Sequence, residues 1–188
     1  MCGIVAGVAG RDVVPVFLQG LKRLEYRGYD SCGVAVVRDG ETDRARSVAR
    51  VKDLAEQGRA EGMHGTVGIA HTRWATHGGP VVANAHPHIA GNRIALVHNG
   101  IIENFAQLRA ELEATGVTMQ SQTDTEVLAH LVNFYLEDDL LEALKKALSR
   151  VTGAYAVAVF DKRHPERIVG ARQGSPMVVG LGLSLIHI

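Results

Sequence analysis

Short apolar runs alternate with amphipathic stretches along the chain, and this pattern predicts a mixture of strands and helices. Strands are expected where β-branched and other apolar residues follow one another, at residues 4–9, 33–38, 45–51, 66–72, 94–98, 154–160, 168–172 and 177–179. Helices are expected where apolar residues recur every three or four positions, at residues 12–24, 52–61, 104–113, 123–135 and 140–151. Because several strands follow one another directly, antiparallel sheets with helices outside are favoured over a doubly wound parallel sheet.

Residues typical of helix caps and turns mark several boundaries of these elements. The residues with the position or spacing of helix caps are Asp12, the pair Asn104 and Gln107, and the pair Thr123 and Glu126. The strand at 94–98 runs into an Asn-Gly pair, which is typical of a hairpin turn. A long irregular stretch follows residue 73 and reaches about residue 92. Long loops inside compact domains usually carry function, and the tryptophan and histidines of this one argue against disorder.

The composition is typical of one globular domain with a sizeable core. The chain has 188 residues, of which 46% are hydrophobic. Its 20 basic and 20 acidic residues cancel, so a nucleic-acid partner has no electrostatic support. No apolar run is long enough to cross a bilayer, and the start of the chain lacks a basic region of a secretory signal. The two cysteines, Cys2 and Cys32, cannot build a disulfide framework, and the expected location is the cytoplasm.

The chain begins MCGIVAGVAG, which places a cysteine directly behind the initiator methionine. Removal of that methionine would leave Cys2 with a thiol and a free α-amine on one residue. The α-amine titrates near ~7.7–8.0 and a free thiol near ~8.5, so the two groups are matched for exchanging a proton. A terminal amine that serves as the base for its own side chain activates a nucleophile. The alternative is a buried strand that happens to begin with cysteine. Cys32, within an apolar run, is expected to be a small core residue.

Three further segments carry polar residues that packing does not require. Arg73 beside Trp74 offers a cation for a carboxylate and an aromatic wall, or else a solvated arginine and a core tryptophan. Asn99 and Gly100 form a hairpin turn, or else aim two N–H groups at one oxyanion. Asp124 compensates the dipole of a helix in its first turn, or else binds a substrate ammonium group.

Histidines gather in the middle of the sequence, and a metal site is one interpretation of them. The histidines in question are His71, His77, His86, His88 and His98. None of the pairs has the helical i, i+4 spacing of a hydrolytic zinc site, and no carboxylate partner is evident. No metal is therefore expected.

Taken together, these segments resemble a known family. The motifs CGIVAG, RLEYRGYDSCGVAVV, IAHTRWATHG, NAHPH, VHNGIIEN and TDTEVLAHL are similar, in the same order, to the glutaminase domain of the glutamine–fructose-6-phosphate aminotransferases. RGYDS and TRWATHG separate this family from other class II glutamine amidotransferases. The resemblance implies an α+β fold of the N-terminal nucleophile (Ntn) hydrolase type, a four-layer αββα sandwich of two antiparallel sheets between helices.

The resemblance also implies an activity and its residues. The domain would hydrolyse the side-chain amide of L-glutamine through a thioester on the N-terminal cysteine, without a cofactor. In the full-length parent, expected to be a homodimer, the ammonia would convert fructose 6-phosphate to glucosamine 6-phosphate. The implied roles are catalytic for Cys2, Asn99 and Gly100, substrate-binding for Arg73, Trp74, Thr76, His77 and Asp124, and supporting for Arg27 and His86. Trp74 would gate the ammonia route.

The similarity ends near residue 182. Residues 2–182 are expected to form an incomplete glutaminase domain, and residues 183–188, LSLIHI, a non-native tail. Two rival hypotheses stay open at this point. One is a non-catalytic module that binds glutamine while its initiator methionine is retained. The other is a different class II amidotransferase.

Overall fold

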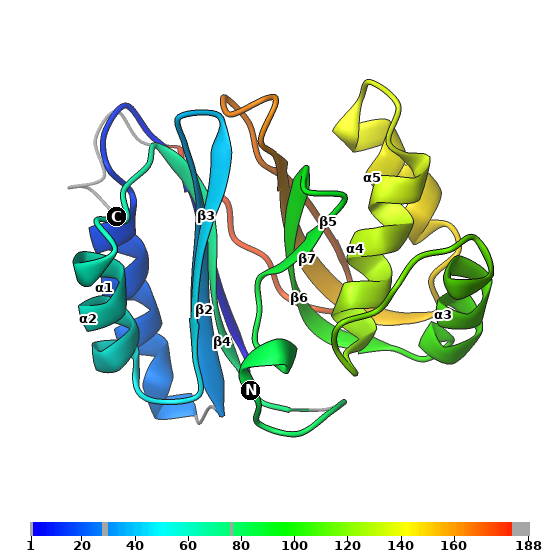
Figure 1. The fold of residues 1–188 in the computed structure, drawn as a ribbon, viewed down its shortest axis with the longest axis horizontal. Helices are drawn as coiled ribbons and strands as arrows, with labels where there is room; N and C mark the ends of the chain where they lie inside the picture. Colours follow the sequence, from blue (N-terminus) through cyan, green and yellow to red (C-terminus); the bar gives the residue numbers. More distant parts are fainter. Residues whose placement is uncertain (1, 28–29, 76, 182–188) are drawn as a thin grey trace.

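Two four-stranded antiparallel sheets lie face to face, and helices cover the outer face of each (Figure 1). The structure, a computed structural model, describes residues 2–27, 30–75 and 77–181, with the side chain of Arg27 also outside the description. The four layers confirm the expected αββα sandwich with antiparallel sheets between helices. Among the described helices, none combines the length and apolar character needed to span a membrane.

The first sheet is covered by the helices α1 (Val14–Leu24) and α2 (Val51–Ala60). Its strands, in spatial order, are β1 (Gly3–Val8), β4 (Val67–Arg73), β2 (Ser31–Arg38) and β3 (Glu41–Ser47). A short 3₁₀ turn, η1 (Glu25–Arg27), follows α1. Strand β2 is buried on both faces because alternate side chains enter different cores. Val34 and Val36 pack against the helices, and Ala35 and Val37 pack toward the other sheet.

The second sheet is covered by three helices from the middle of the chain, α3 (Phe105–Ala114), α4 (Asp124–Tyr135) and α5 (Leu140–Leu148). Its strands, in spatial order, are β5 (His88–Ala90), β6 (Ile94–Ile102), β7 (Gly153–Asp161) and β8 (Val169–Gln173). A second 3₁₀ turn, η2 (Val82–Asn84), precedes β5. Leu96 and Val157 face the helices, where they join a core that contains Val127 and Leu128 of α4.

A thin apolar layer fills the space between the sheets. Ala35 and Ile69 from the first sheet meet Ala95 and Phe160 from the second, and all four are fully buried. Small residues such as alanine let the two backbones approach closely. This packing brings the end of β4, at Arg73, close to the β6 residues that follow His98.

Strand β6 continues through the Asn99-Gly100 pair, so the hairpin-turn interpretation is wrong. The strand β7 pairs with β6 along its whole length, from Ile94 opposite Asp161 to Ile102 opposite Gly153. Gly100 has φ +135°, and a Cβ there would lie 2.0 Å from the Ala154 carbonyl oxygen. The ladder of hydrogen bonds and this close approach therefore require glycine inside the strand.

Other local expectations were also wrong. Residues 177–179 form no strand, and the strand expected at 45–51 already ends at Ser47, because Val51 begins α2. Asn104 makes no cap bond at the start of α3. Its side chain instead accepts from Thr152 N at 2.9 Å and donates to Arg150 O at 2.8 Å, which ties α3 to the start of β7.

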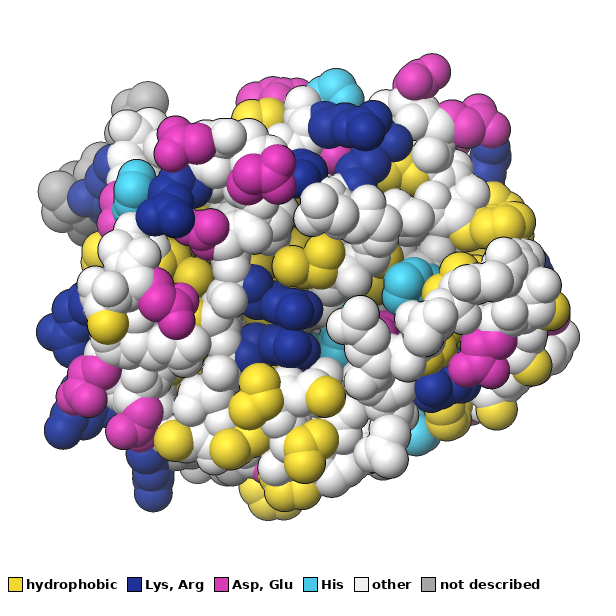
Figure 2. All heavy atoms as spheres, viewed as in Figure 1, with side chains coloured by type: hydrophobic (Ala, Val, Ile, Leu, Met, Phe, Trp, Pro, Cys, Tyr) yellow, Lys and Arg dark blue, Asp and Glu magenta, His cyan; other side chains and the backbone are white. Residues whose placement is uncertain are grey.

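Charged side chains of both signs are spread over the face shown in Figure 2, and basic side chains gather at its hollowed centre. Arg44 and Arg46 of β3 reach across to the segment before β5. Arg46 Nη1 donates to the carbonyls of Ala83 at 3.1 Å and Ala85 at 3.0 Å, and Arg44 Nη1 donates to Pro87 O at 3.3 Å. These bonds hold an irregular segment against the edge of the first sheet.

Candidate active site

The thiol of Cys2 lies directly before β1, at the edge where the two sheets meet. Its Sγ accepts a hydrogen bond from Trp74 N at 3.1 Å and lies 3.5 Å from Trp74 O. Burial raises the pKa of this thiol, and the Trp74 N–H opposes that shift without cancelling it. The sulfur is therefore a thiol at neutral pH, and a reaction that uses it as a nucleophile needs a base.

Asn99 brings an amide N–H from the second sheet to the cysteine on the first. Its Nδ2 donates to the Cys2 carbonyl oxygen at 3.4 Å, and its Oδ1 lies 2.8 Å from His71 Nε2. Gly100 follows it in β6 and lines the same cavity as Cys2. An amide N–H beside a nucleophile has the arrangement needed to stabilise an oxyanion.

Asp124 is the first residue of α4 and is almost completely buried. Its Oδ2 accepts from Ile102 N at 3.0 Å, and the Nδ1 atoms of His77 and His98 both lie 3.9 Å from that oxygen. Within the described residues, no lysine or arginine nitrogen lies within 4.0 Å of this carboxylate. A buried carboxylate of this kind can hold an ammonium group that enters the cavity.

The helix that carries Asp124 has half of the expected capping box. Thr123 Oγ1 accepts from Glu126 N at 3.2 Å, as predicted. The Glu126 carboxylate does not return to the Thr123 backbone, and accepts instead from Ser121 N at 2.6 Å and Ser121 Oγ at 2.7 Å. These bonds fold residues 120–123 over the start of α4.

The guanidinium of Arg73 is buried at the end of β4 and holds the loop that follows. Its Nη2 donates to the carbonyls of His77 and Gly78, and its Nη1 donates to Gly79 O at 3.3 Å. Nη1 also pairs with Asp30 Oδ1 at 3.2 Å. The other oxygen of Asp30 accepts from Ala75 N. Arg73 therefore orders residues 75–79 in this structure.

These groups converge on one small cavity. Its volume is about 20 Å³, enough for about one water molecule. It is lined by Cys2, Arg73, Trp74, His77, His86, His98, Gly100, Thr123, Asp124 and Thr125. The structure thus brings together eight of the ten residues expected at the site, although Thr76 and the side chain of Arg27 lie outside the described residues. Trp74 contacts the thiol through its backbone, and its side chain is exposed.

The histidines form a buried, neutral cluster. The rings of His71 and His86 stack at 4.1 Å between centroids, and those of His86 and His88 meet edge to face at 5.0 Å. Burial lowers the pKa of His71 to about 3 and the pKa values of His86 and His88 well below 6.5. In the part of the chain that the structure describes, no group of three or more histidine, cysteine or acidic residues is arranged to hold a metal ion.

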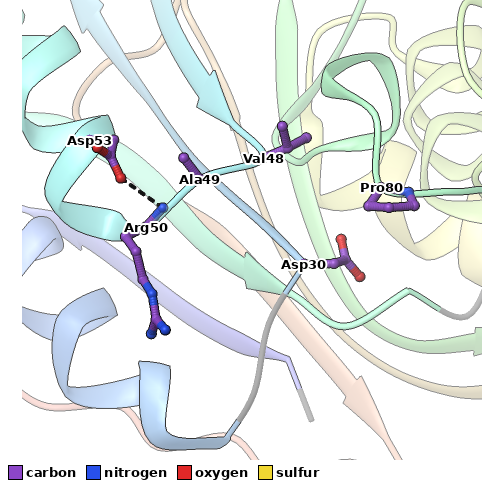
Figure 3. Close-up of a pocket in the computed structure, with 6 residues that line it drawn as sticks. All are labelled: Asp30, Val48, Ala49, Arg50, Asp53 and Pro80. Carbon is purple, nitrogen blue, oxygen red and sulfur yellow. Dashed lines mark hydrogen bonds between the residues drawn. The ribbon is translucent and has the colours of Figure 1, made fainter.

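A larger hollow of about 420 Å³ lies nearby, between Asp30 and Pro80 on one side and the start of α2 on the other (Figure 3). Asp53 accepts from Arg50 N at 3.0 Å and so caps α2 (Figure 3). Asp30 bonds with Ser31, Arg73 and Ala75. Both carboxylates thus serve the fold, and the reactive groups face the smaller cavity.

Sequence reasoning assigned no role to Asp30 or His71, and both contact site residues. Each lies in a motif that was singled out, Asp30 in RGYDS and His71 in IAHTRWATHG. Their position inside these motifs was the signal in the sequence that could have pointed to them. The pairing of β2 with β4 sets Ser31 opposite Arg73 and so brings Asp30 to the guanidinium. Only the packing of one sheet on the other brings His71 to Asn99.

Comparisons with known proteins relate the chain to glutamine amidotransferases. A model of the glutamine amidotransferase domain matches residues 71–179. The chain is 59% identical over 187 residues to glutamine–fructose-6-phosphate aminotransferase (isomerizing) of Bordetella pertussis, and 54% identical over 184 residues to the protein of that name in Xylella fastidiosa. Each match covers 97% of this chain but only 31% and 30% of the respective relative, so the chain spans about a third of their length.

A solved structure has the same fold. The glutamine phosphoribosylpyrophosphate amidotransferase from B. subtilis, complexed with ADP and GMP, matches with a TM-score of 0.71 and 30% identity. The match covers 86% of this chain and 35% of that one. The four layers are therefore those of the Ntn-hydrolase fold that the sequence motifs implied. Since the family model matches more than half of the sequence, over a region that contains Arg73, Asn99, Gly100 and Asp124, the chain belongs to the glutamine amidotransferase domain family.

Proposed function

We propose that this chain hydrolyses the side-chain amide of L-glutamine and is the glutaminase domain of a glutamine–fructose-6-phosphate aminotransferase. One observation carries the proposal. The Cys2 thiol and the buried Asp124 carboxylate line a single cavity, and the Asn99 amide bonds to the Cys2 carbonyl beside it, although the three residues come from different layers of the fold. A nucleophile, an oxyanion donor and an ammonium site in that arrangement suit an amide whose far end is an α-amino acid.

The proposed reaction begins after removal of Met1. The α-amine of Cys2 takes the proton of its own thiol, and the sulfur attacks the amide carbon of glutamine. Asn99 Nδ2 and the Gly100 N–H stabilise the negative oxygen of the tetrahedral intermediate. The C–N bond then breaks, the α-ammonium returns the proton to the leaving nitrogen, and ammonia departs. Water hydrolyses the resulting thioester to give glutamate and the free thiol.

The substrate would be held at its far end by opposite charges. Asp124 is proposed to bind the α-ammonium group, and Arg73 the α-carboxylate, with Thr76 and His77 completing the pocket. Trp74 is proposed to cover the substrate and gate the ammonia route, while Arg27 and His86 support the site. The contacts of Arg73 with the carbonyls of residues 77–79 give it a second role, because the same guanidinium orders the loop beside the substrate.

The larger reaction follows from the names of the relatives. In the whole protein, the ammonia would be used to convert fructose 6-phosphate to glucosamine 6-phosphate. We further propose a homodimeric parent and a cytoplasmic location. The residues of this chain carry the glutamine half-reaction in that scheme.

The test is release of glutamate from glutamine by the purified chain, together with its intact mass. Glutamate release with a mass that lacks Met1 supports the proposal. Glutamine binding without hydrolysis, with Met1 retained, would favour a non-catalytic module instead. Release by a protein that retains Met1 would rule out the α-amine as the base.

We expect Asn99→Ala to lower the turnover of glutamine by roughly 10²–10³-fold with a smaller effect on KM, because a lost oxyanion donor acts on the transition state. Steady-state glutamate release measures both constants. Gln107→Ala, which removes an exposed amide on α3, is the matched control and should leave both unchanged. A rise in KM alone would make Asn99 a residue of the strand and nothing more.

We expect Arg73→Lys to raise the KM for glutamine, because a lysine ammonium cannot reproduce a bidentate contact with a carboxylate. It also cannot serve Asp30 and three carbonyls at once, so the loop 77–79 should become more accessible to protease. Arg59→Lys, an exposed change on α2, should do neither. An unchanged KM would place the carboxylate site elsewhere.

A further inference from the structure

We infer that His71 is a positioning residue that fixes the orientation of the Asn99 amide, and that it acts through the N–H on its Nε2 atom. The inference rests on the proposed function, in which Asn99 Nδ2 stabilises the oxyanion. His71 touches neither the thiol nor the cavity, and its role is to decide which end of the Asn99 amide faces Cys2.

The hydrogen bonds of Asn99 determine where the His71 proton lies. The Cys2 carbonyl oxygen can only accept, so the Asn99 atom 3.4 Å away from it must be the donor Nδ2. That choice leaves Oδ1 facing His71 Nε2 at 2.8 Å. Because Oδ1 is an acceptor, Nε2 must carry the proton of the neutral ring. If Nε2 were unprotonated, the amide would turn over and present its oxygen to the developing oxyanion.

The surroundings of His71 keep this donor constant. The side chain is fully buried, and burial lowers its pKa to about 3, so the ring stays neutral across the pH range in which the enzyme would work. In the described structure its Nδ1 makes no hydrogen bond of normal geometry, and the Asn99 amide and the His98 backbone favour the charged ring less than burial opposes it.

Stacking holds the ring from the other side. His86 lies 4.1 Å from His71 between centroids, and its own segment is fixed to β3 by Arg44 and Arg46. Gly33 makes this placement possible, because a Cβ there would lie 2.2 Å from the His86 carbonyl oxygen. His86 in turn meets His88, whose Nε2 lies 3.0 Å from the Thr123 hydroxyl at the start of α4. A chain of contacts through His71, His86 and His88 thus connects the Asn99 donor to the helix that carries Asp124.

The first test compares two substitutions of His71. Leucine has no donor, whereas glutamine can place an amide N–H near the position of Nε2. We expect His71→Leu to lower the kcat of glutamine hydrolysis roughly 10- to 100-fold with KM within about 3-fold, and His71→Gln to restore most of it. In an Asn99→Ala background, His71→Leu should have little further effect, because the group that it positions is gone.

The controls distinguish a failure of this inference from a folding defect and from a failure of the proposed function. Alkylation of Cys2 by iodoacetamide should proceed at a similar rate in the wild type and in His71→Leu if the site is otherwise intact. If the wild type releases glutamate and His71→Leu releases it at the same rate, this inference is overturned but the proposed function is not. An independent effect of His71→Leu in the Asn99→Ala background would also overturn it. A wild type without any release would instead overturn the proposed function.

The second measurement does not depend on enzymatic activity. Long-range ¹H–¹⁵N spectra of the labelled protein show which nitrogen of each imidazole carries the proton. Comparison with a His71→Gln sample assigns the signals. We expect His71 to be protonated on Nε2 at neutral pH. Protonation on Nδ1 would overturn the inference, whatever the glutaminase assay shows.

Discussion

Replacing Cys2 with alanine should abolish glutamine hydrolysis and leave glutamine binding largely intact. The thiol is the nucleophile of the proposed reaction, and no second thiol lines the described cavity. The hydroxyls that do line it, those of Thr123 and Thr125, are held by hydrogen bonds at the start of α4. The groups proposed to bind the amino-acid end, Arg73 and Asp124, are held by their own hydrogen bonds to the backbone, none of which involves the sulfur. Glutamate release measures the first effect, and calorimetric titration with glutamine measures the second.

Cys32→Ala is the matched control for this substitution. Cys32 is a buried thiol on β2, and burial raises its pKa to about 12. It packs with the core under α1 and α2, as the sequence predicted, so its loss should affect stability slightly and hydrolysis not at all. Hydrolysis near the wild-type rate in Cys2→Ala would remove Cys2 from the mechanism.

Lowering the pH from 7.5 to 5.5 should sharply reduce the free energy of unfolding. The cause is the buried cluster of His71, His86 and His88, whose pKa values all lie well below 6.5 in the folded protein. In the unfolded chain these histidines titrate near ~6.5 and bind protons that the folded state excludes. Since the unfolded state then holds more protons, stability falls as the pH falls below that value.

The magnitude is large relative to the stability of a domain. For each histidine that stays unprotonated in the folded state, the free energy of unfolding falls by about 1.4 kcal/mol per pH unit below the unfolded pKa. Three such histidines together lower it by about 4 kcal/mol between pH 7.5 and 5.5. A typical domain has only ~5–15 kcal/mol in total. Urea unfolding at several pH values measures the slope. His64→Gln changes an exposed histidine and should leave the slope unaltered. Equal stability at pH 5.5 and 7.5 would show that the cluster accepts protons while folded.

The sequence pattern predicts most of the fold because the core elements have strong periodicity. The helix with Val14, Phe17 and Leu21 on one face and the apolar strand around Val34 both formed as expected. The pattern failed where tertiary pairing overrides a local signal. Asn99-Gly100 is a turn by local preference, but the ladder with β7 keeps it extended. His88–Ala90 is too short to produce a period and becomes a strand only by pairing with β6.

The sequence predicts which residues belong to the candidate site, but not how those residues are arranged. Motif order indicated Cys2, Asn99 and Asp124, and the structure places Cys2 and Asp124 around one cavity and Asn99 in contact with Cys2. No local pattern could show that Arg73 donates hydrogen bonds to three carbonyls, or that His71 bonds to Asn99. Those contacts depend on the placement of one sheet over the other and on the path of the loop after β4.

The hydrogen bond from Asn99 to Cys2 crosses from one sheet to the other, so the reacting geometry depends on how two separate layers are aligned. A displacement of about 1 Å between reacting groups can reduce a rate by ~10²-fold. The alignment is set by the apolar layer between the sheets, at positions such as Ala95 and Phe160. Directed evolution of the reaction rate should therefore diversify the middle of the sandwich as well as its rim, because residues that never contact the substrate set the alignment of the groups that do.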